Sequence, residues 1–491
     1  MKRSLLPLFA LACVALLCGA GSYVPGVPPL DAPLGERLPL FSVVPFVALL
    51  VAIAVFPWLA GAWWESNANK AKLAALIALP SAGLLVLHFG GTGLSALTER
   101  TMDYVSLMTF LAALFVVCGG IFVESSLPGT PLVNTALLAL GALLANVIGT
   151  TGASMVLIRP LIRANQHRRR VAHVPIFLIF IVANCGGLLT PLGDPPLFLG
   201  YLAGVPFGWT LRLWPAWALV NGALLAIFLV WDHVALSREP RERSAGRPQV
   251  LPTDPTAAPR FDTGLRTADA RPVLRVLGLR NVALLLAIVA TVFAAGCGLG
   301  NGGHRWPFGV PELLMAGLAI ASWWLTSREL REKNGFTFGP IIEVAVLFAG
   351  IFITMTPALS ILNARGARLG LHEPWQFFWG SGLLSSILDN APTYLAFAAV
   401  ASGSEGIPVQ GQYLGHALAH GAGSGFGEIL AVISCGCVLM GALTYIGNGP
   451  NFMVKAIAQE SNIRMPGFLG YMIYSSTILI PLFVLVTILL F

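Results

Sequence analysis

Charged residues are scarce in this sequence. They occupy 10% of its 491 positions, whereas soluble domains carry about 25%. Hydrophobic residues make up 56%, and several apolar runs reach the roughly 20 residues that a helix needs to cross a bilayer. These proportions exclude an ordinary soluble protein. They predict an all-α polytopic membrane protein whose partner is the lipid bilayer.

The sequence also lacks the motifs of common enzyme and metal sites. It contains no HExxH motif, no P-loop and no CxxC pair, and its seven cysteines lie almost wholly in apolar segments. Each cysteine is interpreted as a small core residue. The net charge of +7 does not indicate a nucleic-acid partner, because the arginines cluster in a few loops, as in other polytopic proteins. We expect no enzyme and no cofactor.

Two segments differ in composition from the rest of the chain and suggest how it is divided. Residues 1–22 are interpreted as a signal peptide, with an uncleaved first helix as the alternative, because Lys2 and Arg3 precede an apolar stretch and then small residues. Residues 232–275 are rich in Arg, Pro, Asp and Thr and are interpreted as a cytoplasmic linker. This linker separates two membrane repeats, 40–231 and 276–491.

Each repeat is expected to contain three helices, a re-entrant hairpin, a broken helix and a closing helix. The hairpins are placed at about 132–163 and 375–402, and the broken helices at about 175–200 and 428–450. Following the helices in order gives the two repeats opposite orientations in the membrane. The sequence therefore predicts inverted repeats.

The basic residues support this layout. Most lie in loops assigned to the cytoplasmic side, including the Arg168–Arg170 run, as the positive-inside rule requires. The segments assigned to the outside hold only six, namely Arg37, Arg100, Arg212, Arg305, Arg365 and Arg368. We expect a multi-pass protein of the inner membrane, with its C-terminus outside.

Four short polar stretches interrupt the apolar sequence. NVIGTTGAS (Asn146–Ser154) precedes TPLGDPP (Thr190–Pro196), and SSILDNAPT (Ser385–Thr393) precedes TYIGNGPN (Thr444–Asn451). Unwound backbone within a membrane is tolerated only where it is buried in protein or lines a cavity. Paired interruptions in two halves are the best sequence indication of a transporter's binding site.

Asp194 and Asp389 are the most informative single residues. An ionisable group at mid-membrane is costly and is a functional-site hypothesis by default. The alternative is that each carboxylate only caps a half-helix. Glu343 lies in the first turns of its helix. A role in proton coupling and a structural position at the membrane interface are equally good interpretations of this residue. Carboxylates, hydroxyls, amides and freed carbonyls supply the oxygen ligands that hard cations such as Na⁺ prefer.

The segments VANCGGLLTPLGDPPLFLGYL, LDNAPTYLAF and LTYIGNGPNFMVKAIA resemble the NhaD-type Na⁺/H⁺ antiporters and their citrate-transporter relatives. These families belong to the ion transporter superfamily, which includes arsenite pumps and divalent-anion symporters. The resemblance runs from about Ser42 to the C-terminus and is weakest in 232–275. It implies inverted repeats, a substrate site near the midplane, a homodimer and an elevator-like motion. The ion ligands that it implies are Thr150, Thr151, Ser154, Asp194, Asp389, Asn390, Thr393 and Asn448.

The Ser-Asn-Thr hairpin tips of the divalent-anion symporters are replaced here by GTTGAS and LDNAPT. This departure favours a cation over a carboxylate as the primary substrate. The predicted function is Na⁺/H⁺ antiport, with Asp194, Asp389 and Glu343 as candidate proton-coupling residues. Transport of citrate or another oxyanion is the alternative, and an ion channel or membrane-embedded enzyme is a remote one.

Overall fold

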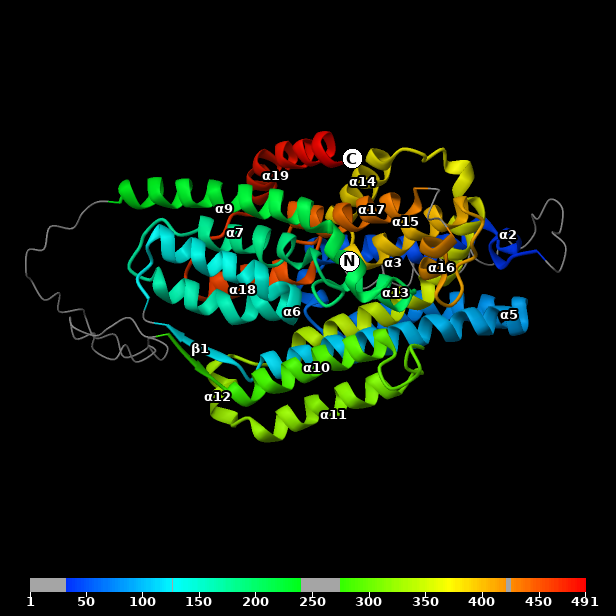
Figure 1. The fold of residues 1–491 in the computed structure, drawn as a ribbon, viewed down its shortest axis with the longest axis horizontal. Coiled ribbons are helices and arrows are strands. Elements are labelled where there is room, and N and C mark those ends of the chain that lie inside the picture. Colours follow the sequence, from blue (N-terminus) through cyan, green and yellow to red (C-terminus); the bar gives the residue numbers. More distant parts are fainter. Residues whose placement is uncertain (1–31, 126, 240–273, 421–424) are drawn as a thin grey trace, which may run out of the picture.

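The computed structural model describes residues 32–125, 127–239, 274–420 and 425–491 (Figure 1). The prediction for residues 1–22 lies outside these ranges. Within them, eight helices are long and apolar enough to cross a membrane. The membrane-protein class predicted from composition is confirmed.

One part of the molecule consists of long helices packed around α5. They are α3 (Val44–Leu59), α5 (Asn67–Cys118), α10 (Leu279–Cys297), α11 (Val310–Leu325) and α13 (Gly339–Arg365). Short helices α2 (Leu34–Arg37), α4 (Gly61–Trp64) and α12 (Arg328–Lys333) join or flank them. The described residues of this part contain no broken helix of the TPLGDPP type.

Helix α5 is two antiparallel helices, interrupted at Gly90, whose φ is +54°. The Lys70 ammonium pairs with Glu343 of α13 at 2.7 Å, and the Tyr104 hydroxyl donates to the Ala345 carbonyl at 3.0 Å. A straight helix would separate residues 70 and 104 by about 51 Å. Because both reach the same turn of α13, the chain must reverse between them.

The second part holds the hairpins and broken helices. Its elements are α6 (Pro131–Ala164), α7 (His173–Ile181), α8 (Pro195–Leu202), α14 (Pro374–Ile387), α15 (Asn390–Ser404), α16 (Tyr413–His420), α17 (Phe426–Met440) and α18 (Gly449–Glu460). Helices α9 (Trp214–Ser237) and α19 (Phe468–Leu490) pack along each other at its edge (Figure 1). All nine residues of α7 are buried, so this broken helix lies in the interior.

Helix α6 is a hairpin that reverses near Gly149, where φ is +74° and ψ is 157°. Asn134 and Asn165, near its two ends, exchange side-chain hydrogen bonds of 3.0 and 2.9 Å. A continuous helix would hold them about 46 Å apart. The two arms therefore lie side by side, and the chain enters and leaves this hairpin at one end.

Helices α14 and α15 form the second hairpin, which turns at Leu388 and Asp389. Phe377 and Phe397 pack with ring centroids 6.4 Å apart, edge to face. A Cβ on Gly380 would lie 3.0 Å from the Phe397 ring, so glycine allows the two arms to approach closely. This turn lies in the SSILDNAPT segment.

The described residues also contain two short strands, which the all-α prediction did not include. Strand β1 (Phe122–Ser125) pairs antiparallel with β2 (Leu274–Leu277), with Phe122 opposite Leu277. Asn281 donates to the Gly120 carbonyl at 2.9 Å and so fixes the end of α5 beside the start of α10. The pairing connects segments about 150 residues apart in the chain, so no local pattern in the sequence could reveal it.

The predicted linker boundaries require a correction. Helix α9 continues to Ser237, and Asp232, assigned to the linker at 232–275, is fully buried in it. At the other end, β2 already begins at Leu274. A charged residue at the end of an apolar run is expected to be exposed to solvent. Asp232 is buried instead, because side chains from α6, α7 and the loop between them bind its carboxylate.

Candidate functional site

The carboxylate of Asp194 is the centre of the candidate site, and it is 2% exposed. The Thr150 hydroxyl donates to its Oδ1 at 2.9 Å, and the Asn448 amide donates to the same oxygen at 3.0 Å. The Asn390 amide donates to Oδ2. Four of the predicted site residues, taken from both halves of the chain, are therefore in direct contact.

Proline places Asp194 at the start of α8. Pro195 lacks a backbone N–H and pushes the preceding residue into extended conformation, and Asp194 has φ −147° and ψ 146°. Asp194 makes no side-chain cap to its own helix. Its carboxylate is directed instead to the hairpins α6 and α14–α15 and to the other broken helix.

Asn448 occupies the matching position in the second half. It precedes Gly449-Pro450 at the start of α18 and has nearly the same angles as Asp194, φ −152° and ψ 141°. Its amide also donates to the Ala183 carbonyl at 3.0 Å. The two broken helices thus place one acid and one amide side by side.

Four helix N-termini meet at this point. Thr150 begins the second arm of α6, Asp194 precedes α8, Asn390 begins α15 and Asn448 precedes α18. Helix N-termini carry partial positive charge and exposed N–H donors. In the described part of the chain no lysine, arginine or histidine contacts the Asp194 carboxylate. The negative charge is therefore balanced only by neutral donors and helix dipoles.

Close backbone approaches shape both breaks in the same way. A Cβ on Gly193 would lie 2.0 Å from the Gly187 carbonyl oxygen, and one on Gly447 would lie 2.6 Å from that of Gly441. Any larger residue at Gly193 or Gly447 would force the loop apart. The glycines of TPLGDPP and TYIGNGPN are thus needed for this packing.

A second contact also occurs in both halves. The Thr190 hydroxyl donates to the Asn146 carbonyl, and the Thr444 hydroxyl donates to the Ser386 carbonyl at 2.5 Å. Each hydroxyl ties a broken helix to the hairpin of its own half. Thr150 lies four residues after Asn146, and Asn390 lies four residues after Ser386, so the two occupy matching positions in their hairpins. Both side chains donate to Asp194.

Three buried oxygens on the hairpins and broken helices of this site have no hydrogen-bond partner among the described residues. They are Ser154 Oγ, one helical turn beyond Thr150, Asn184 Oδ1 and Asn390 Oδ1. Buried polar atoms are nearly always paired with protein or an ordered ligand. An oxygen without a donor is a natural ligand for a cation.

The remaining predicted residues are placed differently. Asp389 is half-buried and caps α15, accepting from the Ala391 N–H at 3.1 Å, and Thr393 donates to the Asp389 carbonyl at 2.9 Å. Glu343 pairs with Lys70 on the other part of the molecule. Thr151 is half-buried, and none of its contacts ties it to Asp194. Asp389 thus has the geometry of a helix cap, which was the alternative hypothesis for this residue.

Two further asparagines belong to the site. Asn184 donates to Asn451 Oδ1 at 2.7 Å, and Asn451 donates to the carbonyls of Gly441 and Thr444, both at 2.9 Å. This chain of bonds joins the two broken helices directly. Asn451 lies within TYIGNGPN, so its motif was identified although its role was not. Asn184 had no comparable signal beyond the glycines that follow it.

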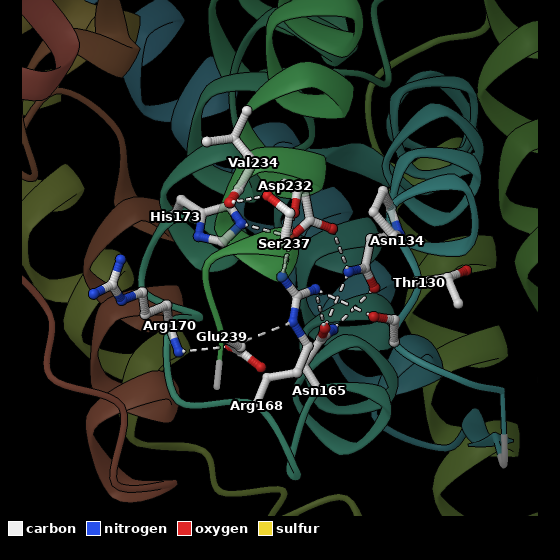
Figure 2. A network of polar contacts seen from close by, with 12 residues as sticks. Thr130, Asn134, Asn165, Arg168, Arg170, His173, Asp232, Val234, Ser237 and Glu239 are labelled. Carbon is white, nitrogen blue, oxygen red and sulfur yellow. Dashed lines mark hydrogen bonds and ion pairs between the residues drawn. The ribbon is translucent and has the colours of Figure 1, made fainter. Parts of the chain in front are cut away.

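Asp232 is the centre of a second buried polar group, which the sequence did not indicate (Figure 2). Its carboxylate accepts from Asn134 at 2.8 Å, from Arg168 at 2.5 Å and lies 2.8 Å from His173 Nε2. Arg168 also donates to Asn165 at 3.0 Å. This group, defined here as the Asp232 cluster, fastens the open end of hairpin α6 to α7 and α9.

A family model described as "Putative citrate transport" matches residues 35–491. A search of curated proteins found no match. The match covers nearly the whole chain and agrees with the resemblance carried by TPLGDPP, LDNAPT and TYIGNGPN. This chain therefore belongs to the citrate transporter family of the ion transporter superfamily.

Proposed function

We propose that this transporter couples substrate movement to a cation and a proton that compete for Asp194, with Na⁺/H⁺ exchange as its basic reaction. The observation that carries the proposal is one fully buried carboxylate with no basic partner in the described structure. Burying an uncompensated charge costs several kcal/mol. Binding Na⁺ or H⁺ removes that cost, so each ligand is favoured and each excludes the other.

The surrounding oxygens suit Na⁺. Asp194 supplies the charge, Thr150 supplies a hydroxyl, and Ser154 and Asn390 each supply an oxygen that has no hydrogen-bond partner. A 180° rotation of the Asn390 amide group exchanges the positions of Nδ2 and Oδ1. The side chain then donates a hydrogen bond to the charged carboxylate through Nδ2. Through Oδ1 it accepts a hydrogen bond from the protonated carboxyl group or coordinates Na⁺. Asn390 is then the residue that adjusts the site to its occupant.

Exchange follows without a separate proton path. Na⁺ arriving from one side displaces the proton from Asp194, and a proton arriving from the other side displaces Na⁺. The charge at Asp194 is neutralised in both loaded states. The empty, charged site is disfavoured in the membrane, which prevents leakage of either ion alone.

The recurring glycine approaches and threonine bonds support the inverted-repeat interpretation. In inverted-repeat transporters the site lies between broken helices at the midplane, and the repeats exchange conformations to open it to alternate sides. We infer the same arrangement here, with the hairpins, the broken helices and the two helices fastened to them, α9 and α19, as the mobile unit. The homodimer implied by the family resemblance remains a prediction.

Transport of citrate or another carboxylate is the second candidate, because the family description names citrate. The four helix N-termini that meet at Asp194 also favour an anion near the site. In this case Na⁺ or H⁺ on Asp194 would remove the repulsion between its carboxylate and the substrate. The cation site is common to both candidates.

Proteoliposomes containing a pH dye test the proposal and separate the candidates. A pulse of Na⁺ should change the internal pH of proteoliposomes that contain the wild type, and Asp194→Asn should abolish this change. A pulse of K⁺ in place of Na⁺ tests the selectivity for the cation. Proton movement that needs citrate together with Na⁺ would favour the carboxylate candidate. Citrate uptake that is independent of both Na⁺ and pH would contradict the role of Asp194.

A further inference from the structure

A basic cavity lies far from Asp194, at the end of the molecule that carries the Asp232 cluster. Its volume is about 950 Å³, within the range of about 300–1,000 Å³ that is typical of small-molecule sites. Its lining includes five arginines: Arg168, Arg169, Arg170, Arg238 and Arg464. These come from the loop after α6, the end of α9 and the turn between α18 and α19. Such a concentration of one charge in a hollow indicates an anionic ligand.

The arginines differ in how they are held. Arg168 is buried and pairs with Asp232 at 2.5 Å and with Glu239 at 3.9 Å, so its charge is balanced within the protein. The side chains of Arg170, Arg238 and Arg464 are exposed at the cavity. Glu239 accepts from the backbone N–H groups of Arg169 and Arg170, both at 3.1 Å, and thereby fixes the loop that presents them. The positive lining is thus held in place by acids that lie behind it.

The cavity also borders the apolar surface of the membrane helices. Trp231 of α9 and Tyr474 of α19 line it, and their ring centroids are 5.9 Å apart. Trp and Tyr favour the depth of lipid headgroups. Beside them, Val230, Leu469 and Ile473 are 64%, 71% and 67% exposed. A soluble anion would have no use for this apolar face, whereas the acyl chains of a lipid would cover it.

From these observations we propose that the cavity binds the headgroup of an anionic phospholipid. The phosphate lies among Arg170, Arg238 and Arg464, the glycerol region lies at Trp231 and Tyr474, and the acyl chains follow the outer face of α9 and α19. The side that carries these arginines is the predicted cytoplasmic side, where basic pockets between membrane helices bind anionic lipids. The bound lipid joins α9 to the turn between α18 and α19.

Native mass spectrometry and titration of lipids against the detergent-purified full chain test this proposal. The probes are phosphatidylglycerol, phosphatidylcholine and inorganic phosphate. Phosphatidylglycerol should bind, and the other two should bind far more weakly. The variant Arg170→Gln/Arg464→Gln should bind phosphatidylglycerol roughly 30-fold more weakly, which corresponds to about 1 kcal/mol for each arginine.

Arg328→Gln is the matched control, because Arg328 is 93% exposed on α12 and does not line the cavity. It should bind phosphatidylglycerol like the wild type, and Arg170→Lys/Arg464→Lys should keep most of the affinity. Gel filtration confirms that each variant is folded. Equal binding by the Gln double variant and the control would overturn the proposal. Binding of inorganic phosphate as tight as that of the lipid would overturn it in favour of a soluble anion.

Discussion

Asp194 and Asp232 are both buried, at 2% and 0% exposure, yet only Asp232 has basic partners among the described residues. Asp232 is held by the Arg168 guanidinium, by His173 and by Asn134, whereas Asp194 is held by Thr150 and two amides. A buried acid with a basic partner is a structural ion pair. A buried acid with only neutral partners still favours a cation or a proton. Burial alone therefore does not distinguish the two acids, whereas their partners do.

The two acids hold opposite ends of one hairpin. Asp194 binds Thr150 at the tip of α6, and Asp232 binds Asn134 at its open end. The open end is fixed by an arginine and two asparagines, which form bonds that a transported ion cannot replace. The tip is fixed only by the acid that we propose to be titrated. We expect the hairpin to respond to ions at its tip and to remain attached at its open end.

Replacing Asp194 should have the largest effect on transport. Asp194→Asn keeps the shape but removes the negative charge, so exchange should fall to the background of empty liposomes while the protein stays folded. In the wild type the apparent Na⁺ affinity should weaken about tenfold for each unit of falling pH while the proton competes for the site. Dye-based proteoliposome assays at several pH values measure both effects. Exchange by Asp194→Asn with an unchanged pH profile would refute the competition mechanism.

Replacing Asp232 should have the largest effect on stability. Asp232→Asn leaves the buried Arg168 side chain with only the more distant Glu239 as a charged partner, and breaking a buried pair costs about 3–5 kcal/mol. The melting temperature in detergent should fall sharply, and the pH dependence of exchange by the surviving protein should be unchanged. Arg168→Gln/Asp232→Asn should recover part of the loss. A normal melting temperature with an altered pH profile would make Asp232 a second coupling residue.

Asn390 should show an intermediate effect. Asn390→Ala removes one donor to Asp194 and one candidate oxygen ligand, so Na⁺ affinity should weaken by roughly tenfold, or about 1.4 kcal/mol. Thr393→Ala is the control, because Thr393 donates only to a local carbonyl on the same hairpin. Sodium titration of the exchange rate measures the difference. Equal affinities for the two variants would remove Asn390 from the site.

Asp389 should matter less than Asp194. Asn also accepts hydrogen bonds at a helix start, so Asp389→Asn should keep the cap and most of the exchange, whereas Asp389→Ala should cost about 1 kcal/mol of stability. Exchange rates and melting temperatures of the two variants test this ordering. Complete loss of exchange in Asp389→Asn would show instead that the site uses two carboxylates.

The smallest effect is expected at Glu343. Its carboxylate is 40% exposed and pairs with Lys70 of α5, in the part of the molecule that does not hold the hairpins, so it does not contact Asp194. Glu343→Gln should therefore leave both the exchange rate and its pH profile within error of the wild type. A shifted profile in the proteoliposome assay would assign Glu343 the coupling role that its sequence position allowed.

The sequence determined the class and the centre of the site. A scarcity of charge and long apolar runs require membrane helices, and the glycines and prolines of TPLGDPP and TYIGNGPN break those helices wherever they occur, because these are local effects of the backbone. The same motifs contain Asp194 and Asn448. Thr150 and Asn390 lie in the other two interruptions, so all four contacting residues were identified before their contacts were known.

The tertiary structure decided which partners each acid has. The donors to Asp194 lie 44, 196 and 254 residues away in the chain, and the partners of Asp232 lie 59 to 98 residues away. Whether a carboxylate is a cap, an ion pair or an ion site depends on these distant partners, which no local pattern specifies. The sequence therefore left Asp389 and Asp194 nearly equal and Asp232 in a linker. Packing separated them, because only packing brings an arginine to one acid and excludes it from another.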